Sequence, residues 1–429
     1  MDTHTMKLDS YWLDTAPPFL PACEGPVDGH ADVVVIGAGF TGLSAAQALG
    51  KRGASVTVVD AGRVGGGASG RNGGQVNTGV AQDFVALAAQ LGIERASACY
   101  RAYADAVDTV ERLIVEENID CDYVASGKLK LAAKPHHFAH LEKTAELIRR
   151  AVDPHIELID GARIRDEVQS DSFYGGLLQR HGGQMHMGRF AVGLAHAAVR
   201  RGAKVYEHAP VTSIVKDGAA HRVVTARGEV RAKQVLIATG PSRHGPFGWY
   251  RRRLAPVGSF IVVTEPLPPA LLARMLPNRR AYTTTRLMHN YFRVTPDARL
   301  LFGGRARFTA SERPSDAKSG RILQQGLATM FPLLAAARID YCWGGLVDMS
   351  ADRLPHAGQH DGIYFSMGYS GHGTQMSTHM GQVMADVMDG RTDRNPWDES
   401  EWNAIPGHTG KPWFLPLVGT YYRIKDLFY

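Results

Sequence analysis

Residues 33–51 read VVVIGAGFTGLSAAQALGK, and this stretch decides the fold. Four apolar β-branched residues, Val33–Ile36, come first and have the pattern of a buried strand. The glycine pattern GAGFTG follows at residues 37–42, and the alanine-rich run 43–51 has the apolar spacing of a helix. Strand, glycine turn and helix in this order predict a dinucleotide-binding unit, because the N–H groups at a helix start attract phosphate.

The glycines and an acidic residue beyond them have separate expected roles. We expect Gly37 to permit the tight turn, Gly39 to let a pyrophosphate approach the backbone, and Gly42 to let helix and strand pack closely. A second apolar run, residues 55–59, ends at Asp60, whose carboxylate can accept hydrogen bonds from ribose hydroxyls. This fingerprint serves NAD and FAD alike, so other segments must distinguish the two dinucleotides.

Three further segments favour FAD. The run GGGASGRNGGQ at residues 65–75 has few large side chains, so its backbone can lie against a flat ring. A strand that ends at Thr239 and Gly240 supplies a second small-residue turn. The segment GYSGHGT, residues 368–374, joins a predicted strand to a predicted helix. The positive end of that helix suits the anion that forms on a reduced flavin ring.

Composition limits the class of protein. A chain of 429 residues is long enough for two domains with buried cores. The net charge of +6 comes from scattered lysines and arginines, so a nucleic-acid partner is not expected. The four cysteines lie far apart, which indicates neither a zinc site nor a disulfide framework and fits the cytoplasm. The sequence has no apolar run of about eighteen residues, so we expect membrane contact to be at most peripheral.

The order of predicted elements indicates an α/β fold of the two-domain, α+β kind. Residues 84–118 have the spacing of two packed helices, whereas residues 257–304 contain mainly short strands. We therefore expect a Rossmann-like FAD-binding domain interleaved with an antiparallel-sheet substrate domain. The expected segments are a surface arm at 1–30, FAD-binding segments at 31–85, 186–246 and 340–400, substrate segments at 86–185 and 247–339, and a docking segment at 401–429.

Four motifs together resemble one family. In chain order they are GASGRNGGQ (67–75), YFRVTPDARLLFGGR (291–305), WGGLVDMSADRLPHAG (343–358) and GYSGHGTQMSTHMG (368–381). With the SYW at residues 10–12 and the closing YYRIKDL, they resemble the D-amino-acid oxidase superfamily of FAD-dependent oxidoreductases. Within it, the chain looks most like the bacterial γ-glutamylputrescine oxidases and L-pipecolate oxidases. The resemblance covers nearly the whole chain.

The resemblance implies where FAD binds. It implies that residues 37–42 hold the pyrophosphate, Asp60 the ribose, the Val211 backbone the adenine, and Ser69–Gln75 the flavin. Relatives with covalent flavin have a cysteine near the stretch that corresponds to residues 349–354, and this stretch contains none, so we expect non-covalent FAD. We also expect no metal. The expected cofactor-binding residues are Gly37, Gly39, Phe40, Thr41, Gly42, Asp60, Ala61, Ser69, Arg71, Asn72, Gly73, Gly74, Gln75, Val211, Thr239, Gly240, Gly371, His372, Gly373 and Thr374.

The implied reaction is oxidation of the C–N bond of a small amine or amino acid to an imine. FAD carries the redox step by accepting a hydride at N5, so the protein contributes orientation and electrostatics. The implied substrate is γ-glutamylputrescine or L-pipecolate, and oxygen reoxidises the flavin. Two alternatives stay open: a dehydrogenase that passes electrons to a quinone or carrier, and a non-catalytic, flavin-binding redox sensor.

Residues for the substrate side come from the strand-rich segment and from the glycine loops. Strand alternation places Tyr291 and Arg293 on one face. For each arginine, a salt-bridged position on the surface is the alternative. The expected substrate-side residues are Gln75, Arg286, His289, Tyr291, Arg293, Arg305, Trp343 and His372.

Other groups of residues suggest different sites that we do not expect. His136, His137 and His140 lack a completing carboxylate or cysteine, so we expect surface histidines rather than a metal site. The glycine loops do not fit G-x-S-x-G, which excludes a serine nucleophile of the hydrolase kind. The aromatic and basic tail, residues 413–429, is expected to dock on the body of the protein rather than on a membrane.

Overall fold

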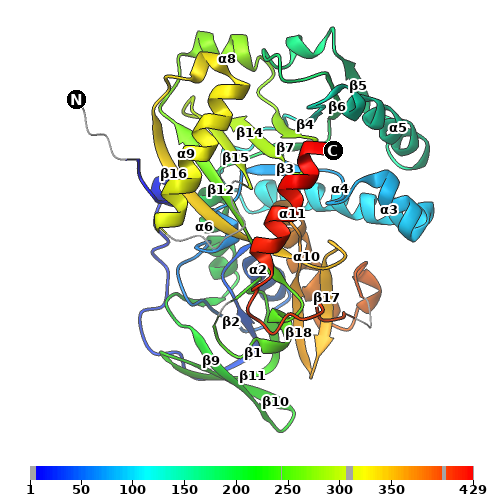
Figure 1. The fold of residues 1–429 in the computed structure, drawn as a ribbon. Coiled ribbons are helices and arrows are strands. Elements are labelled where there is room, and N and C mark those ends of the chain that lie inside the picture. Colours follow the sequence, from blue (N-terminus) through cyan, green and yellow to red (C-terminus); the bar gives the residue numbers. More distant parts are fainter. Residues whose placement is uncertain (1–5, 243, 306–312, 399–401, 429) are drawn as a thin grey trace.

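The computed structural model describes residues 6–242, 244–305, 313–398 and 402–428. Within these residues the chain forms two eight-stranded sheets and a two-stranded ladder of β3 (Gln75–Asn77) and β7 (Gly182–Gln184). The two sheets lie at opposite ends of the molecule (Figure 1). The predicted fold class, a Rossmann-like domain interleaved with a largely antiparallel sheet, is confirmed.

The first sheet contains the predicted strand, glycine turn and helix. Its main order is β17-β18-β11-β1-β2-β8, and all neighbours are parallel except the edge pair β17 and β18. The central strand β1 is buried on both faces, which explains its uninterrupted apolar run. A hairpin of β9 and β10 extends from β11. The bounds are β1 His30–Ile36, β2 Val56–Val59, β8 Lys204–Tyr206, β9 Val211–Asp217, β10 Ala220–Thr225, β11 Gly228–Ile237, β17 His356–His360 and β18 Ile363–Met367.

Two helices from opposite parts of the chain pack closely beside this sheet. Helix α2 starts at the glycine turn, and α10 starts after the second glycine loop. A Cβ on Gly381 of α10 would lie 2.5 Å from the carbonyl oxygen of Thr41, so only glycine permits this approach. The helices around the first sheet are α2 Phe40–Lys51, α4 Ile93–Glu116, α6 Met187–Arg200, α7 Gly248–Arg251 and α10 Gly373–Met388.

The second sheet has the order β16-β12-β15-β14-β13-β4-β6-β5. Its neighbours are antiparallel except β13 and β4, which are parallel. Residues 84–118 form two helices, α3 and α4, as predicted. The remaining bounds are β4 Lys128–Leu131, β5 Glu157–Asp160, β6 Gly175–Gln179, β12 Ala255–Thr264, β13 Ala281–Thr284, β14 Asn290–Val294, β15 Leu300–Gly304, β16 Ile339–Met349, α3 Phe84–Leu91, α5 Pro135–Ala151, α8 Pro269–Met275 and α9 Arg313–Met330.

Two expectations about position were wrong. Strand β16, expected in the FAD-binding segment 340–400, pairs with β12 along its length and so belongs to the second sheet. The N-terminal arm does not run over the surface throughout, because helix α1 (Tyr11–Thr15) inserts into the body. Trp12 has no exposed surface, and its indole Nε1 donates a 2.7 Å hydrogen bond to the carbonyl oxygen of Asn72. Burial of the Tyr11 and Trp12 rings favours insertion of α1 into the body over an extended course along the surface.

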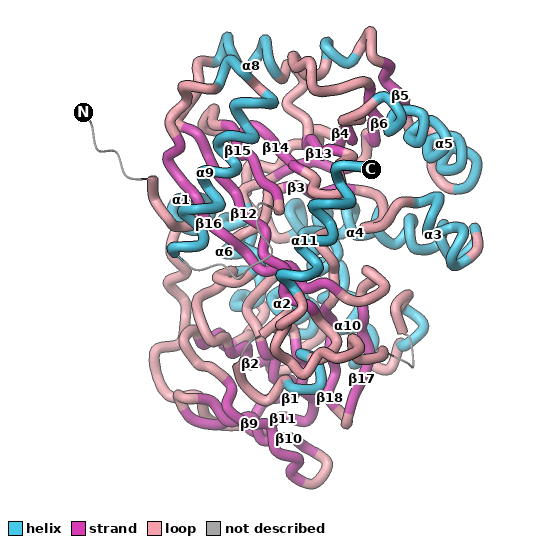
Figure 2. The backbone as a smooth tube through the Cα atoms, viewed as in Figure 1, coloured by secondary structure: helices cyan, strands magenta, loops and turns pink. Residues whose placement is uncertain are grey.

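The C-terminal segment packs on the body, as expected. Helix α11 (Leu415–Phe428), drawn in front of the middle of the molecule in Figure 2, packs its Leu415 end against Ala255 and Val257 of β12. The Asp426 carboxylate accepts a 2.7 Å hydrogen bond from the Leu287 N–H group, and Arg353 donates to the Tyr422 hydroxyl at 3.1 Å. None of the helices in the described part of the chain combines the length and the apolar character needed to cross a bilayer.

Candidate active site

One continuous cavity of about 1300 Å³ brings the predicted segments together. Its size exceeds that of a typical small-molecule pocket, roughly 300–1,000 Å³, so a dinucleotide and a second molecule can share it. Two expected cofactor residues, Gly42 and Gly74, pack behind its wall. The expected cofactor residues in its lining are Gly37, Gly39, Phe40, Thr41, Asp60, Ala61, Ser69, Arg71, Asn72, Gly73, Gln75, Val211, Thr239, Gly240, Gly371, His372, Gly373 and Thr374.

The first glycine turn has the geometry that its sequence predicts. Gly37 has φ +114°, and a Cβ there would lie 2.6 Å from the carbonyl oxygen of Ala238. A Cβ on Gly42 would overlap the carbonyl oxygen of Gly37, so this glycine permits close packing of helix and strand. Gly39 precedes α2 without a side-chain cap, which leaves part of the positive helix end open to the cavity.

Asp60 supports this turn as well as facing the cavity. Its two carboxylate oxygens accept hydrogen bonds from the N–H groups of Ala38 (2.6 Å) and Gly62 (2.7 Å). Burial raises the pKa of the Asp60 carboxyl, and these two hydrogen bonds act in the opposite direction. Each oxygen has a further lone pair, so the ribose contact predicted for Asp60 is compatible with its present bonds.

The second helix start lies beside the first. The Thr41 and Tyr369 hydroxyls are 2.8 Å apart, which joins the start of α2 to the loop before α10. Asp348 accepts a 2.7 Å hydrogen bond from the Gly368 N–H group, and burial raises the pKa of Asp348 to about 6. His372 precedes α10 without capping it, and among the described residues its buried Nδ1 has no hydrogen-bond partner. An unpartnered buried nitrogen beside a cavity is suited to a ligand contact.

The run 69–75 forms the wall between the two helix starts, and Trp343 supports it from behind. Trp343 is fully buried, its Nε1 donates to the Arg71 carbonyl oxygen at 3.0 Å, and it does not line the cavity. We expected Trp343 on the substrate side, and this was wrong because its ring packs under the glycine run. Gln75 lines the cavity, and its amide donates to the carbonyl oxygens of Tyr282 and Phe292.

Four of the strand-derived substrate residues line the far end of the cavity: Arg286, His289, Tyr291 and Arg305. The Tyr291 ring packs against Gly73, where a Cβ would lie 2.7 Å from a ring carbon, and its hydroxyl lies 3.1 Å from the Ser259 hydroxyl. Burial and the positive charge of Arg305 lower the pKa of His289 to about 3, so this imidazole is neutral.

Arg293 does not reach the cavity, although it shares a face with Tyr291 as predicted. Its guanidinium is 1 % exposed and donates to the carbonyl oxygens of Gly74 (2.6 Å) and Met185 (2.8 Å). The expectation that Arg293 meets the substrate was therefore wrong. The side chain holds the backbone of the glycine run in place instead.

Two lysines on β4 are cavity residues that the sequence reasoning missed. Lys128 and Lys130 line the cavity, whereas Leu129 and Leu131 between and beside them enter the core. Burial lowers the pKa of Lys128 to about 7, and its ammonium donates to the Thr78 carbonyl oxygen at 3.1 Å. The sequence KLKL at residues 128–131 could have indicated this, because alternation in a strand places the leucines on one face and the lysines on the other, so the two faces have different environments.

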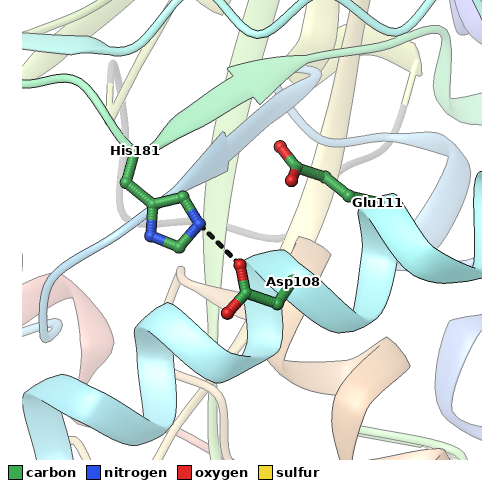
Figure 3. A group of neighbouring side chains, drawn as sticks. All are labelled: Asp108, Glu111 and His181. Carbon is green, nitrogen blue, oxygen red and sulfur yellow. Dashed lines mark hydrogen bonds and ion pairs between the residues drawn. The ribbon is translucent and has the colours of Figure 1, made fainter.

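Two of the three histidines expected on the surface belong to the cavity wall. His137 is buried and its Nδ1 lies 2.7 Å from the Thr285 hydroxyl, and His140 Nε2 lies 2.8 Å from an Asp83 oxygen. The surface expectation was wrong for His137, which α5 turns towards the second sheet, whereas His140 is exposed as expected, with 46 % of its side chain accessible. A different trio, Asp108, Glu111 and His181, lies close together outside the cavity (Figure 3). His181 pairs with Asp108 at 2.9 Å, and Glu111 accepts a hydrogen bond from Tyr123.

No described residue that lines the cavity is a cysteine. Cys342 is fully buried, its thiol donates to the Asp316 carbonyl oxygen, and burial raises the pKa of this thiol to about 12. A protonated thiol behind the wall is a poor candidate for a covalent flavin bond.

The chain resembles proteins of one family. A family model described as "FAD dependent oxidoreductase" (DAO) matches residues 32–387. Gamma-glutamylputrescine oxidoreductase of Escherichia coli (strain K12) is 33% identical over 431 residues, which cover 99% of each chain. Probable oxidoreductase OrdL of Haemophilus influenzae is 33% identical over 375 residues, 85% of this chain and 84% of the relative.

Solved structures share the fold. The crystal structure of glycine oxidase from Geobacillus kaustophilus has a TM-score of 0.70 at 22% identity, and the match covers 88% of this chain and 99% of that one. The match places both sheets within a known fold. FAD is the cofactor that the family description names.

Proposed function

We propose, from the premise that this chain belongs to the DAO family of FAD-dependent oxidoreductases, that it oxidises the C–N bond of an amine or amino acid to an imine. The observation that carries the proposal is the single cavity, which joins a glycine-lined dinucleotide site to a pocket of ionisable side chains. The name of the Escherichia coli relative supports a γ-glutamylputrescine-like substrate. An L-pipecolate-like molecule is the other substrate that we propose.

Backbone groups hold FAD in this proposal. Residues 37–42 bind the pyrophosphate, Asp60 the ribose, the Val211 backbone the adenine, and residues 69–75 the flavin ring. The start of α10 lines the cavity, and the positive end of this helix would stabilise negative charge on a bound flavin. Bound FAD supplies the two-electron acceptor of the reaction, and its binding is non-covalent because the cavity wall offers no cysteine among the described residues.

Side chains at the far end orient the amine and keep it neutral. Lys128, Lys130 and Arg305 place positive charge around this end of the cavity. Burial in the first place, and this positive charge in addition, lower the pKa of His372 to about 3. The same positive charge disfavours an ammonium ion, so a bound substrate amine releases its proton more readily. A neutral amine is the form whose neighbouring carbon can lose a hydride.

The proposal includes the compartment and the electron acceptor. The four cysteines are free in the structure, which supports a reducing compartment, and we place the reaction in the cytoplasm. Oxygen is the proposed acceptor that returns the flavin to its oxidised state. A quinone or carrier protein is the alternative acceptor, and it leaves the first half of the reaction unchanged.

The test is anaerobic mixing of the purified yellow holoenzyme with γ-glutamylputrescine, L-pipecolate, sarcosine and glycine, followed by admission of air. We expect the flavin absorbance to bleach with at least one amine and to return rapidly in air. Bleaching of the flavin absorbance without a rapid return in air would indicate that an acceptor other than oxygen reoxidises the flavin. Absence of bleaching with every amine would contradict the proposed oxidation and favour a redox sensor.

A further inference from the structure

The substrate end of the cavity continues past the flavin-facing residues into a second region. Helices α3 and α5 lie beside each other at the edge of the second sheet, and both contribute residues to the cavity lining (Figure 1). Gln90, near the end of α3, is exposed, so this region reaches the surface. We call it the outer arm, lined by Gln82, Asp83, Ala86, Gln90, His140 and Leu141.

Polar contacts fix the walls of the outer arm. Asp83 accepts hydrogen bonds from the Ala86 N–H group at 3.0 Å and from His140 Nε2 at 2.8 Å, so one carboxylate joins the start of α3 to α5. Each oxygen of Asp83 accepts one of these hydrogen bonds. The two hydrogen bonds hold the walls in place, so the arm is a formed part of the cavity.

Positive charge lies where the outer arm meets the inner pocket. Lys130 lies on the cavity face of β4, and Asp83 attracts it without forming an ion pair within 4 Å among the described residues. Lys128 lies two residues deeper on the same face. Asp352, another acid in the lining, is engaged by His356 at 3.1 Å. The junction therefore has one buried and one half-buried lysine, and among the described residues neither forms an ion pair with a carboxylate, an arrangement suited to an anionic ligand group.

We propose that the outer arm binds the non-reacting end of an elongated amine, and that Lys130 recognises a carboxylate on that end. This inference rests on the proposed function and defines its substrate class. The oxidised carbon lies at the flavin in the inner pocket, and the rest of the molecule extends along β4 between α3 and α5. A compact amino acid such as glycine fills only the inner pocket and gains nothing from the arm.

A bulky residue in the outer arm tests the first part of the inference. In the wild-type holoenzyme we expect kcat/KM to be higher for ε-aminocaproate than for glycine. Ala86→Trp places an indole in the arm and should lower this selectivity ratio about tenfold, which corresponds to about 1.4 kcal/mol. Ala89 is exposed on the same helix and does not line the cavity, so Ala89→Trp is the matched control and should leave the ratio unchanged.

The charge of Lys130 tests the second part. Lys130→Met should raise KM for ε-aminocaproate about tenfold without changing kcat, because a charge-assisted hydrogen bond is lost from binding alone. KM for the uncharged analogue ε-aminocaproamide should change little. An equal rise for both compounds would indicate a structural role and overturn the assignment of Lys130.

The outcomes separate this inference from the proposed function. If wild-type enzyme prefers glycine, or if Ala86→Trp and Ala89→Trp change the ratio equally, the outer arm is not a substrate subsite although the enzyme still oxidises amines. If no amine bleaches the flavin, the proposed function itself fails. Flavin content and the unfolding midpoint of each variant establish that the comparison is made between folded holoenzymes.

Discussion

At one end of the cavity the walls are backbone, whereas at the other end they are side chains. The proposed cofactor end is built from residues 37–42, 67–75 and 368–374, where small residues let a ligand approach N–H groups. The proposed substrate end collects lysine, histidine, arginine and tyrosine side chains from β4, β14, α5 and the loop before β14, together with Arg305 just after β15. A site made of backbone tolerates few substitutions at its glycines, whereas a site made of side chains can change its specificity without changing its fold.

The largest expected effect comes from a side chain added to the backbone end. A Cβ on Gly39 would lie 2.9 Å from the Ser69 Oγ, and the branched methyl groups of Gly39→Val would extend into the space expected for the pyrophosphate. We expect the purified variant to be colourless, with FAD loss measured by absorbance. Gly25→Ala is the control, since open space surrounds this glycine, and it should remain yellow. A yellow Gly39→Val protein would remove residues 37–42 from the cofactor site.

The next prediction tests whether Arg293 supports the glycine run or contacts the substrate. Arg293→Met leaves the carbonyl oxygens of Gly74 and Met185 without their buried donor and should destabilise the holoenzyme by about 3 kcal/mol. The free energy of unfolding, measured with denaturant, checks this value. Arg231→Met breaks an ion pair to Asp217 whose partners are each about half exposed, and it should cost less than about 1 kcal/mol. A raised KM with an unchanged free energy of unfolding would indicate that Arg293 contacts the substrate instead of supporting the glycine run.

A substitution of Asp60 tests the role of a side chain at the end of the cavity whose walls are mostly backbone. Asp60→Ala removes the acceptor for the Ala38 and Gly62 N–H groups together with the predicted ribose contact. We expect FAD binding to weaken by about 1–3 kcal/mol, roughly fivefold to 150-fold in Kd. Titration of apoprotein with FAD gives the measurement. Asp32→Ala, which removes a partly exposed carboxylate of β1 that pairs with Lys233 of β11, should leave the Kd unchanged. An unaltered Kd in Asp60→Ala would exclude Asp60 from the site.

The same contrast explains what the sequence could predict. Glycine spacing and strand order locate the cofactor end, because its geometry depends on local backbone conformation at fixed positions such as Gly37. The lysines of β4 could not be placed, since β4 pairs with β13, a strand far away in the chain, and this pairing creates the pocket. Trp343 was assigned to the wrong side because closeness to glycines in sequence does not say which face of the loop a ring covers.

Alternation also has a limit that the second sheet makes clear. It places Tyr291 and Arg293 on one face of the sheet, as observed. It does not predict which of the two side chains reaches the cavity and which is covered by other segments. Tyr291 reaches the cavity and Arg293 stops beneath the glycine run, because the β3 segment and Met185 cover the sheet at that point. Tertiary packing, which a strand pattern does not contain, decides between substrate contact and support.

The smallest effect is a pH dependence at the side-chain end. Burial lowers the pKa of Lys128 to about 7, so its ammonium form is present below this pH and is lost as the pH rises through it. A carboxylate-bearing substrate should then lose part of its advantage over the matching amide between about pH 6 and pH 8, by roughly threefold or about 0.7 kcal/mol. The ratio of kcat/KM for ε-aminocaproate and ε-aminocaproamide measures this advantage, and the ionisation of the common amine cancels in the ratio. Lys128→Met should make the ratio independent of pH in this range. A wild-type ratio that stays constant would mean that Lys128 contributes no titrating charge to substrate recognition, which would leave recognition to other cations in the lining, such as Lys130, Arg286 and Arg305.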